Sequence, residues 1–279
     1  MSADFLAAMA HSSRERVARE RALCPREELQ ARARRLPAAP RLTLSKRGFD
    51  LIAEVKLRSP AAGQLKNGGE DIAARVVAYA DAGAAAISVL TEPSRFDGAL
   101  THLAQAASAV AGRVPIMRKD FLVDDYQVYE ARVAGAGGVL IILRMLERAE
   151  LEALIEAAGE LGLFALLEAF DDADLKLAAA LVRTFGARCS LLVGVNCRDL
   201  VTLKVVPGRL ESLAPLLPDS VPRVAESGVA NSSDAARVAA AGYDVALVGS
   251  ALMQAGDPFQ LSSSMLAAGR AAARPRACG

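Results

Sequence analysis

The sequence is short of the side chains that several classes of functional site require. It has no tryptophan and only 4% aromatic residues, so a platform for stacking nucleic-acid bases is not expected. Its 2 histidines, His11 and His102, are too few for a site built on imidazole ligands. The net charge is +1, which gives no basic field to attract nucleic acid. We therefore expect no metal site rich in imidazole ligands and no nucleic-acid partner.

Cysteines and long apolar runs are also scarce. The 4 cysteines, Cys24, Cys189, Cys197 and Cys278, are scattered and form no CxxC pair, which indicates a reducing compartment rather than a disulfide framework. No apolar run reaches the roughly 20 residues of a membrane span. The short run at residues 5–10 lacks the charged start of a signal peptide. We expect a cytoplasmic protein without a membrane partner.

Apolar side chains, by contrast, are abundant and regularly spaced. Hydrophobic residues make up 53% of the chain, enough for a sizeable core. Short apolar runs alternate with Ala-, Leu-, Glu- and Arg-rich segments of helical period, and such runs are typical of parallel strands that are covered on both faces. The runs are residues 51–55, 85–90, 115–117, 139–142, 164–167, 191–195, 222–225 and 245–248.

This alternation predicts the α/β class and, within it, a (β/α)8 TIM barrel. The alternative is a doubly wound open sheet, which usually has fewer strands and a glycine-rich phosphate loop; neither GxGxxG nor GxxxxGK[ST] occurs. We expect residues 1–46 to form an N-terminal helical extension, with the charges of residues 14–21 on a solvated face. Residues 47–265 would form the barrel, and residues 266–279 a C-terminal tail.

In such a barrel the active site lies at the carboxyl ends of the strands. Glu54 and Lys56 are two residues apart at the end of the first predicted strand, so their side chains point to the same face. A carboxylate and an ammonium held together near a low-dielectric mouth perturb each other's pKa, which suits acid–base chemistry. Arg118 neighbours Lys119 and should face the opposite side, so we expect it to be structural. The other strand ends carry Lys119, Glu168, Asn196, Arg198 and Glu226.

Two Gly/Ser turns follow the last two predicted strands. Ser227-Gly228 and Gly249-Ser250 stand where barrel enzymes often bind phosphate through backbone N–H groups. Glycine allows the backbone to approach the phosphate closely. Ser59, just past the first strand, adds a hydroxyl. These turns predict a small phosphorylated substrate.

With their flanking segments, these strand ends resemble the indole-3-glycerol phosphate synthase family. The resemblance covers residues 45–265, and its longest block is PIMRKDFLVDDYQVYEARVAGA at residues 115–136. The other segments are IAEVKLRSP (52–60), AAISVLTEPSRFDG (85–98), LLEAFD (166–171), GVNCRDL (194–200), ESGV (226–229) and LVGSALM (247–253).

The resemblance implies an enzyme of tryptophan biosynthesis that works without a cofactor or a metal. Such an enzyme closes the indole ring of 1-(2-carboxyphenylamino)-1-deoxyribulose 5-phosphate with loss of CO2 and water. The implied catalytic residues are Lys119 as the general acid, Lys56 and Glu54 as a second acid and a base, Glu168 as a base or charge stabiliser, and Glu226 as an orienting carboxylate. The implied phosphate-binding residues are Ser59, Gly228, Gly249 and Ser250. The implied substrate-binding residues are Asn196, Arg198, Ser227, Pro60, Phe96, Phe121, Leu140, Ile142 and Leu200.

The chain departs from the family's pattern at four places. Residues 61–63 read Ala-Ala-Gly where Ser-Lys-Gly is usual. Cys197 replaces a common Asn, Phe170 a common His, and Val206 a common Asp. These departures bear on rate, loop closure or the identity of the substrate, rather than on the reaction class. Cys197 is expected to be structural, because a thiol without a nearby histidine base is a poor nucleophile.

Three other functions remain as alternatives. They are a paralogous enzyme acting on a related arylamino sugar phosphate, a lysine Schiff-base aldolase, and a catalytically silent phosphate-binding barrel. Borohydride trapping separates the aldolase from the cyclising enzyme, while a silent binder has no need for so many coupled charges. We expect a monomer, with a dimer as the alternative.

Overall fold

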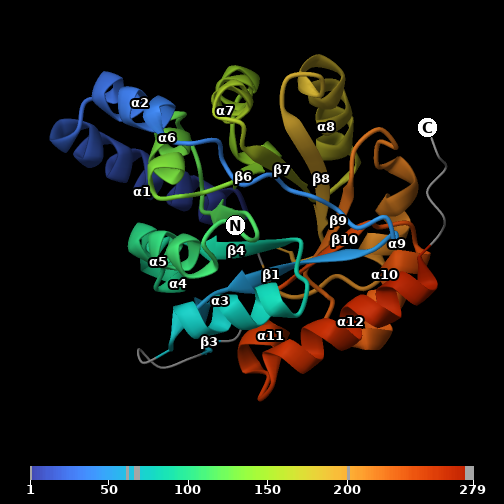
Figure 1. Cartoon of the computed structure of the whole chain (residues 1–279). Coiled ribbons are helices and arrows are strands. Elements are labelled where there is room, and N and C mark those ends of the chain that lie inside the picture. The colour runs from blue at the N-terminus through green and yellow to red at the C-terminus, as the bar shows by residue number, and fades with distance from the viewer. Residues whose placement is uncertain (1, 61–62, 66–69, 200–201, 274–279) are drawn as a thin grey trace.

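A computed structural model describes residues 2–60, 63–65, 70–199 and 202–273. In it the eight apolar runs form a closed barrel of parallel strands, which confirms the predicted (β/α)8 architecture (Figure 1). The strands, in the order in which they pair, are β1 (Asp50–Val55), β4 (Ala86–Leu90), β5 (Ile116–Lys119), β6 (Gly138–Ile142), β7 (Phe164–Ala169), β8 (Ser190–Asn196), β9 (Arg223–Glu226) and β10 (Val245–Val248), and β10 pairs back with β1.

Helices follow the strands around the barrel. Several begin at an Asp or Asn whose side chain accepts a hydrogen bond from the backbone N–H three residues on, as Asp71 does from Ala74 and Asn231 from Asp234. A small antiparallel hairpin, β2 (Arg58–Ser59) with β3 (Gly63–Gln64), follows β1. The helices are α3 (Ile72–Asp81), α4 (Pro93–Phe96), α5 (Leu100–Val110), α6 (Tyr126–Val133), α7 (Arg148–Glu160), α8 (Asp172–Phe185), α9 (Arg209–Leu213), α10 (Ser232–Ala240), α11 (Ser250–Gln254) and α12 (Pro258–Ala272), with 3-10 turns at Leu143–Met145 and Ala214–Leu216.

The alternation of side chains along each strand divides the core into two parts. Leu51, Ala53 and Val55 of β1 belong to the large core between the barrel and its helices. Ile52 belongs instead to the core inside the barrel. Glu54 is the next residue of β1 on the same face as Ile52. The inward faces of the strands are therefore apolar inside the barrel and ionisable at its carboxyl end.

The N-terminal extension is helical, as predicted, and consists of α1 (Ser2–Leu23) and α2 (Arg26–Arg35). Figure 1 shows both helices beside α6 on one side of the barrel, and α2 contacts α6. The prediction that residues 14–21 form a solvated face is wrong for Arg16. Its guanidinium donates two hydrogen bonds, of 2.7 and 2.9 Å, to the buried carboxylate of Asp120 at the end of β5. This pair ties the extension to the mouth of the barrel.

The last helix, α12, packs along α3 and α10 and runs to Ala272. Leu266 is buried, and Arg270 donates hydrogen bonds to Phe49 O and to Asp50. The predicted boundary at residue 265 therefore falls inside a helix of the barrel wall. Within the described ranges, no helix combines the length and the apolar character needed to span a membrane.

Candidate active site

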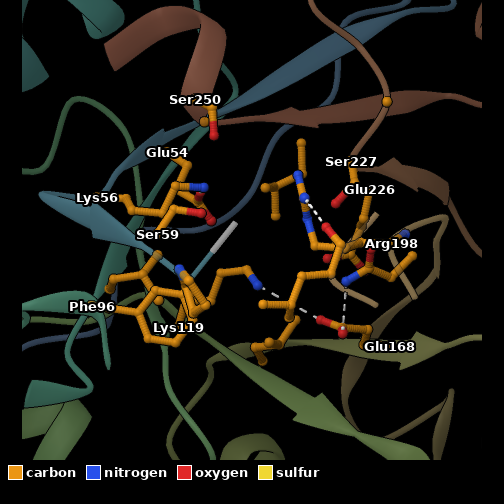
Figure 2. A pocket seen from close by; sticks show the side chains of 18 of the residues that line it. Glu54, Lys56, Ser59, Phe96, Lys119, Glu168, Arg198, Glu226, Ser227 and Ser250 are labelled. Carbon is orange, nitrogen blue, oxygen red and sulfur yellow. Dashed lines mark hydrogen bonds and ion pairs between the residues drawn. The ribbon is translucent and has the colours of Figure 1, made fainter. Parts of the chain in front are cut away.

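A cavity of about 290 Å³ opens at the carboxyl ends of the barrel strands (Figure 2). Every site residue predicted from the sequence lines it, with the exception of Leu200, which lies outside the described residues. The ionisable, the Gly/Ser and the apolar groups thus meet in one place, although they come from all parts of the chain.

Glu54 and Lys56 at the end of β1 form a close ion pair. Lys56 Nζ donates to Glu54 Oε1 at 2.6 Å, and both side chains are largely buried. Burial alone would raise the pKa of Glu54, but the nearby charges of Lys56 and Lys119 outweigh it and lower that pKa below its usual value. Glu54 is therefore ionised at neutral pH and is a hydrogen-bond acceptor.

Lys119, the last residue of β5, extends towards Glu168 of β7 (Figure 2). Its Nζ lies 3.7 Å from Glu168 Oε2, while Asn196 Nδ2 donates to Glu168 Oε1 at 3.0 Å. Burial lowers the pKa of Lys119, but the carboxylates of Glu168, Glu54 and Glu226 together raise it above its ordinary value. Lys119 is therefore a cation that can donate a proton or a hydrogen bond into the cavity.

Glu226 at the end of β9 is the most enclosed acid of the site, with 1% of its surface exposed. In the part of the chain that the structure describes, neither of its carboxyl oxygens has a hydrogen-bond partner. Burial raises its pKa well above the usual value, and the negative charge of Glu168 raises it further. Glu226 therefore keeps its proton to a higher pH than an ordinary glutamic acid.

The segment after β8 places Arg198 at the rim of the cavity. The backbone N–H of Arg198 donates to Asn196 Oδ1 at 2.9 Å, and its Nη1 donates to Leu203 O at 2.7 Å. An isolated antiparallel bridge pairs Arg198 with Val205. Leu203 and Val205 also line the cavity, although neither stands at a strand end and neither was predicted as a site residue.

Gly/Ser turns make one side of the cavity. Ser227 and Gly228 adopt positive φ angles of 65° and 71°, a conformation that serine seldom takes. Ser250 begins helix α11, so the first N–H groups of that helix have no partner within it. Figure 2 shows Ser227 and Ser250 on the opposite side of the cavity from Phe96 and Glu168.

The other side is apolar and includes a residue of the N-terminal extension. The rings of Phe96 and Phe121 lie 6.2 Å apart, and Phe5 of α1 packs edge-on against Phe121 at 5.9 Å. Phe5 was missed because its short apolar run carries no sign of a contact partner more than 100 residues away. The remaining apolar walls are formed by Pro60, Leu140 and Ile142.

Arg118 faces away from the cavity, as predicted, and holds the end of β5. It donates to Glu130 at 3.0 Å and to Asp120 at 3.1 Å. Burial would raise the pKa of Asp120, but its bonds to Arg16 and the charge of Arg118 hold that pKa far below the usual value. The buried acid directly after Lys119 is thus fixed from two sides.

Comparison with known proteins identifies the family. Residues 6–263 match the family described as indole-3-glycerol phosphate synthase. The chain belongs to that family. The indole-3-glycerol phosphate synthase of Kineococcus radiotolerans is 43% identical over 263 residues, or 92% of each chain, and that of Mycolicibacterium smegmatis is 39% identical over 272 residues, or 96% of each. This membership makes the chain a carboxy-lyase of tryptophan biosynthesis.

Solved structures support the fold alone. A thiamine phosphate pyrophosphorylase from Pyrococcus furiosus superposes with a TM-score of 0.59 at 18% identity, over 81% of this chain and 98% of that one. A 3-hexulose-6-phosphate synthase from Salmonella typhimurium superposes with a TM-score of 0.60 at 14% identity, over 80% of this chain and all of that one.

Two of the departures from the indole-3-glycerol phosphate synthase pattern, Cys197 and Phe170, are buried side chains that pack against neighbouring groups. Cys197 is buried behind the backbone of Gly228, and burial raises the pKa of its thiol, so it is a packing residue. Phe170 is buried, with the guanidinium of Arg144 4.6 Å from its ring centre. Residues 61–62 lie outside the described residues.

Proposed function

We propose that this cavity closes the indole ring of 1-(2-carboxyphenylamino)-1-deoxyribulose 5-phosphate to give indole-3-glycerol phosphate, CO2 and water. The observation that carries the proposal is the position of Lys119. It is a largely enclosed cation whose pKa is raised by carboxylates, in a cavity with an apolar wall on one side and Gly/Ser turns on the other. A substrate with an aryl ring at one end and a phosphate at the other matches that division.

Binding would use the two sides of the cavity separately. The phosphate would rest on Ser59, Gly228, Gly249 and Ser250, which line the cavity and can offer it hydroxyl and backbone N–H groups. The aryl ring would pack among Phe96, Phe121, Leu140 and Ile142 with Pro60. Arg198 would pair with the carboxylate of the ring, and Ser227 and Asn196 would bind the hydroxyls of the sugar chain. This orientation places the carbonyl of the sugar chain between the two ends, near Lys119.

Ring closure needs an acid at the carbonyl oxygen. The ring carbon that carries the carboxylate attacks the carbonyl carbon, and the carbonyl oxygen takes a proton from Lys119 to become a hydroxyl. Glu168 would stabilise the positive charge that develops on the aniline nitrogen. The bond to the carboxylate then breaks, and its electron pair restores the aromatic ring as CO2 leaves.

Dehydration needs a second acid and a base. The hydroxyl leaves as water with a proton from Lys56, and the neighbouring carbon loses a proton to Glu54, which forms the double bond of the five-membered ring. The 2.6 Å contact between these two side chains keeps both beside the same part of the substrate. Glu226 would orient the sugar chain.

The charge of Lys119 also favours acid catalysis over a Schiff base. An imine forms only from a neutral amine, and a lysine used in this way normally has a lowered pKa. The pKa of Lys119 is instead raised by its carboxylate neighbours, Glu168 foremost.

The test is incubation of the protein with the proposed substrate while indole fluorescence is followed. We expect turnover without added metal or cofactor. A folded protein that gives no indole signal would refute the proposal. Covalent trapping of a lysine by borohydride in the presence of substrate would favour an aldolase. A cytoplasmic location and a monomeric state remain predictions from the sequence, to be checked by fractionation and by light scattering.

A further inference from the structure

Glu168 and Glu226 stand on either side of strand β8. Glu168 of β7 is in register with Gly194, and Glu226 of β9 is in register with Asn196 of the same central strand. Both carboxyls are almost fully buried, and they point into the cavity. Two acids in such a place repel each other unless one of them keeps its proton.

The residue of β8 that pairs with Glu168 is Gly194, which has no side chain. Gly194 lies in the interior of β8, between Val193 and Val195, and its φ angle is not among the positive ones. Conformation therefore does not require glycine here. Space does, because a Cβ built on Gly194 would collide with Glu226 Oε1 and would lie 3.1 Å from Glu226 Cδ and from Leu166 Cδ1.

We propose that Gly194 is a positioning residue for the reaction: its missing side chain is the seat on which the Glu226 carboxyl rests, leaning across β8 towards Glu168. The inference rests on the proposed function, and it deepens it by naming what places one acid of the site. Three carboxyl oxygens of this pair, Glu168 Oε2 and both of Glu226, lack a hydrogen-bond partner among the described residues. A proton held on Glu226 provides the donor that two ionised carboxylates cannot.

As a consequence, the Glu226 carboxyl faces the cavity and remains able to form a hydrogen bond with the substrate. Asn196 and Lys119 engage Glu168, while Glu226 is left to donate a hydrogen bond to a substrate hydroxyl. A carboxyl displaced by about 1 Å can cost on the order of 100-fold in rate. A single methyl group at residue 194 is therefore enough to test the seat.

The test is a double-mutant cycle with Gly194→Ala, Glu226→Ala and the pair combined, read out as kcat, KM and the free energy of unfolding. We expect Gly194→Ala to lower kcat about 10- to 100-fold with a smaller change in KM. In the Glu226→Ala background, the same methyl should change kcat by less than about 3-fold and should destabilise the fold much less. Equal effects in the two backgrounds would overturn the proposal.

Gly138→Ala provides the matched control. Gly138 is also a barrel-strand glycine, and a Cβ there would collide with the ring of Phe164 rather than with an acid. Its effect should be the same with and without the Glu226 carboxyl. If Gly194→Ala does not fold, the combined variant should fold. If neither folds, contact with Leu166 rather than with Glu226 is what requires glycine at this position, and the proposal is refuted. A wild-type enzyme without cyclising activity would refute the proposed function alone, because the unfolding cycle still reports on the seat.

Discussion

Lys119 Nζ lies 3.7 Å from Glu168 Oε2, which is longer than the 2.7–2.9 Å of a charge-assisted hydrogen bond. Glu168 is meanwhile held by Asn196 Nδ2 at 3.0 Å. The ammonium is thus kept charged and roughly in place by a carboxylate that does not occupy its donors. That arrangement suits a group that must donate a proton to a substrate in the same cavity.

Lys119→Ala should lose most of its turnover while the fold survives. A positioned general acid contributes about 10²- to 10⁴-fold in rate, so kcat should fall by that order. The measurement is indole fluorescence under saturating substrate, with circular dichroism as the check on folding. Lys176→Ala is the control, because Lys176 is exposed on α8 and forms a surface ion pair with Asp172. A Lys119→Ala enzyme with near-normal kcat would show that another group is the acid.

Ser250→Ala should weaken recognition of the phosphate more than the chemistry. Loss of one hydroxyl at the Gly/Ser side should raise KM by about 10- to 150-fold, which is the equivalent of a hydrogen bond to a charged group. The loss should vanish with a substrate analogue that lacks the phosphate. Ser108→Ala, an exposed serine on α5, should change neither value. A Ser250→Ala effect that persists with the dephosphorylated analogue would contradict the assignment.

Much of this site could be predicted from the sequence because strand ends of a barrel converge wherever the helices lie. Glu54, Lys119 and Glu226 were found by counting strands, and all three line the cavity. Phe5 and Arg16 could not be found in that way. Their partners, Phe121 and Asp120, are more than 100 residues away, and no local pattern records such a contact.

Glu226→Gln should make the protein more stable at the expense of turnover. Burial first, and then the charge of Glu168, raise the folded-state pKa of Glu226, so the folded state binds a proton more tightly than the unfolded chain does. Stability therefore falls as pH rises from the unfolded pKa of about 4.3 through the folded pKa. The amide has no proton to lose. In urea unfolding, the free energy of unfolding of Glu226→Gln should exceed that of the wild type only slightly at pH 4 and by about 1 kcal/mol or more at pH 7.

The control for that prediction is Glu27→Gln, an exposed acid in the first turn of α2. It should show no such growth in stability between pH 4 and pH 7. A Glu226→Gln protein that is less stable than the wild type at both values would mean that the Glu226 carboxyl is ionised and paired in the folded state.

Arg16→Met should destabilise the fold because the buried carboxylate of Asp120 then loses its hydrogen bonds to Arg16 and keeps the neighbouring charge of Arg118. Removing one partner of a buried ion pair costs about 3 kcal/mol or more, which urea unfolding at pH 7 would measure. The folded-state pKa of Asp120 lies below its unfolded value: burial opposes this, but the bonds to Arg16 and the charge of Arg118 outweigh it. The stabilisation is therefore complete above the unfolded pKa of about 3.9 and is lost as pH falls further. The difference in the free energy of unfolding between the wild type and Arg16→Met should accordingly be full at pH 7 and shrink below about pH 4.

Arg19→Met is the control, because Arg19 is an exposed arginine on the same helix. It should cost less than about 0.5 kcal/mol at either pH. A difference for Arg16→Met that stays constant on acidification would show that the arginine acts through packing and not through the charge of Asp120.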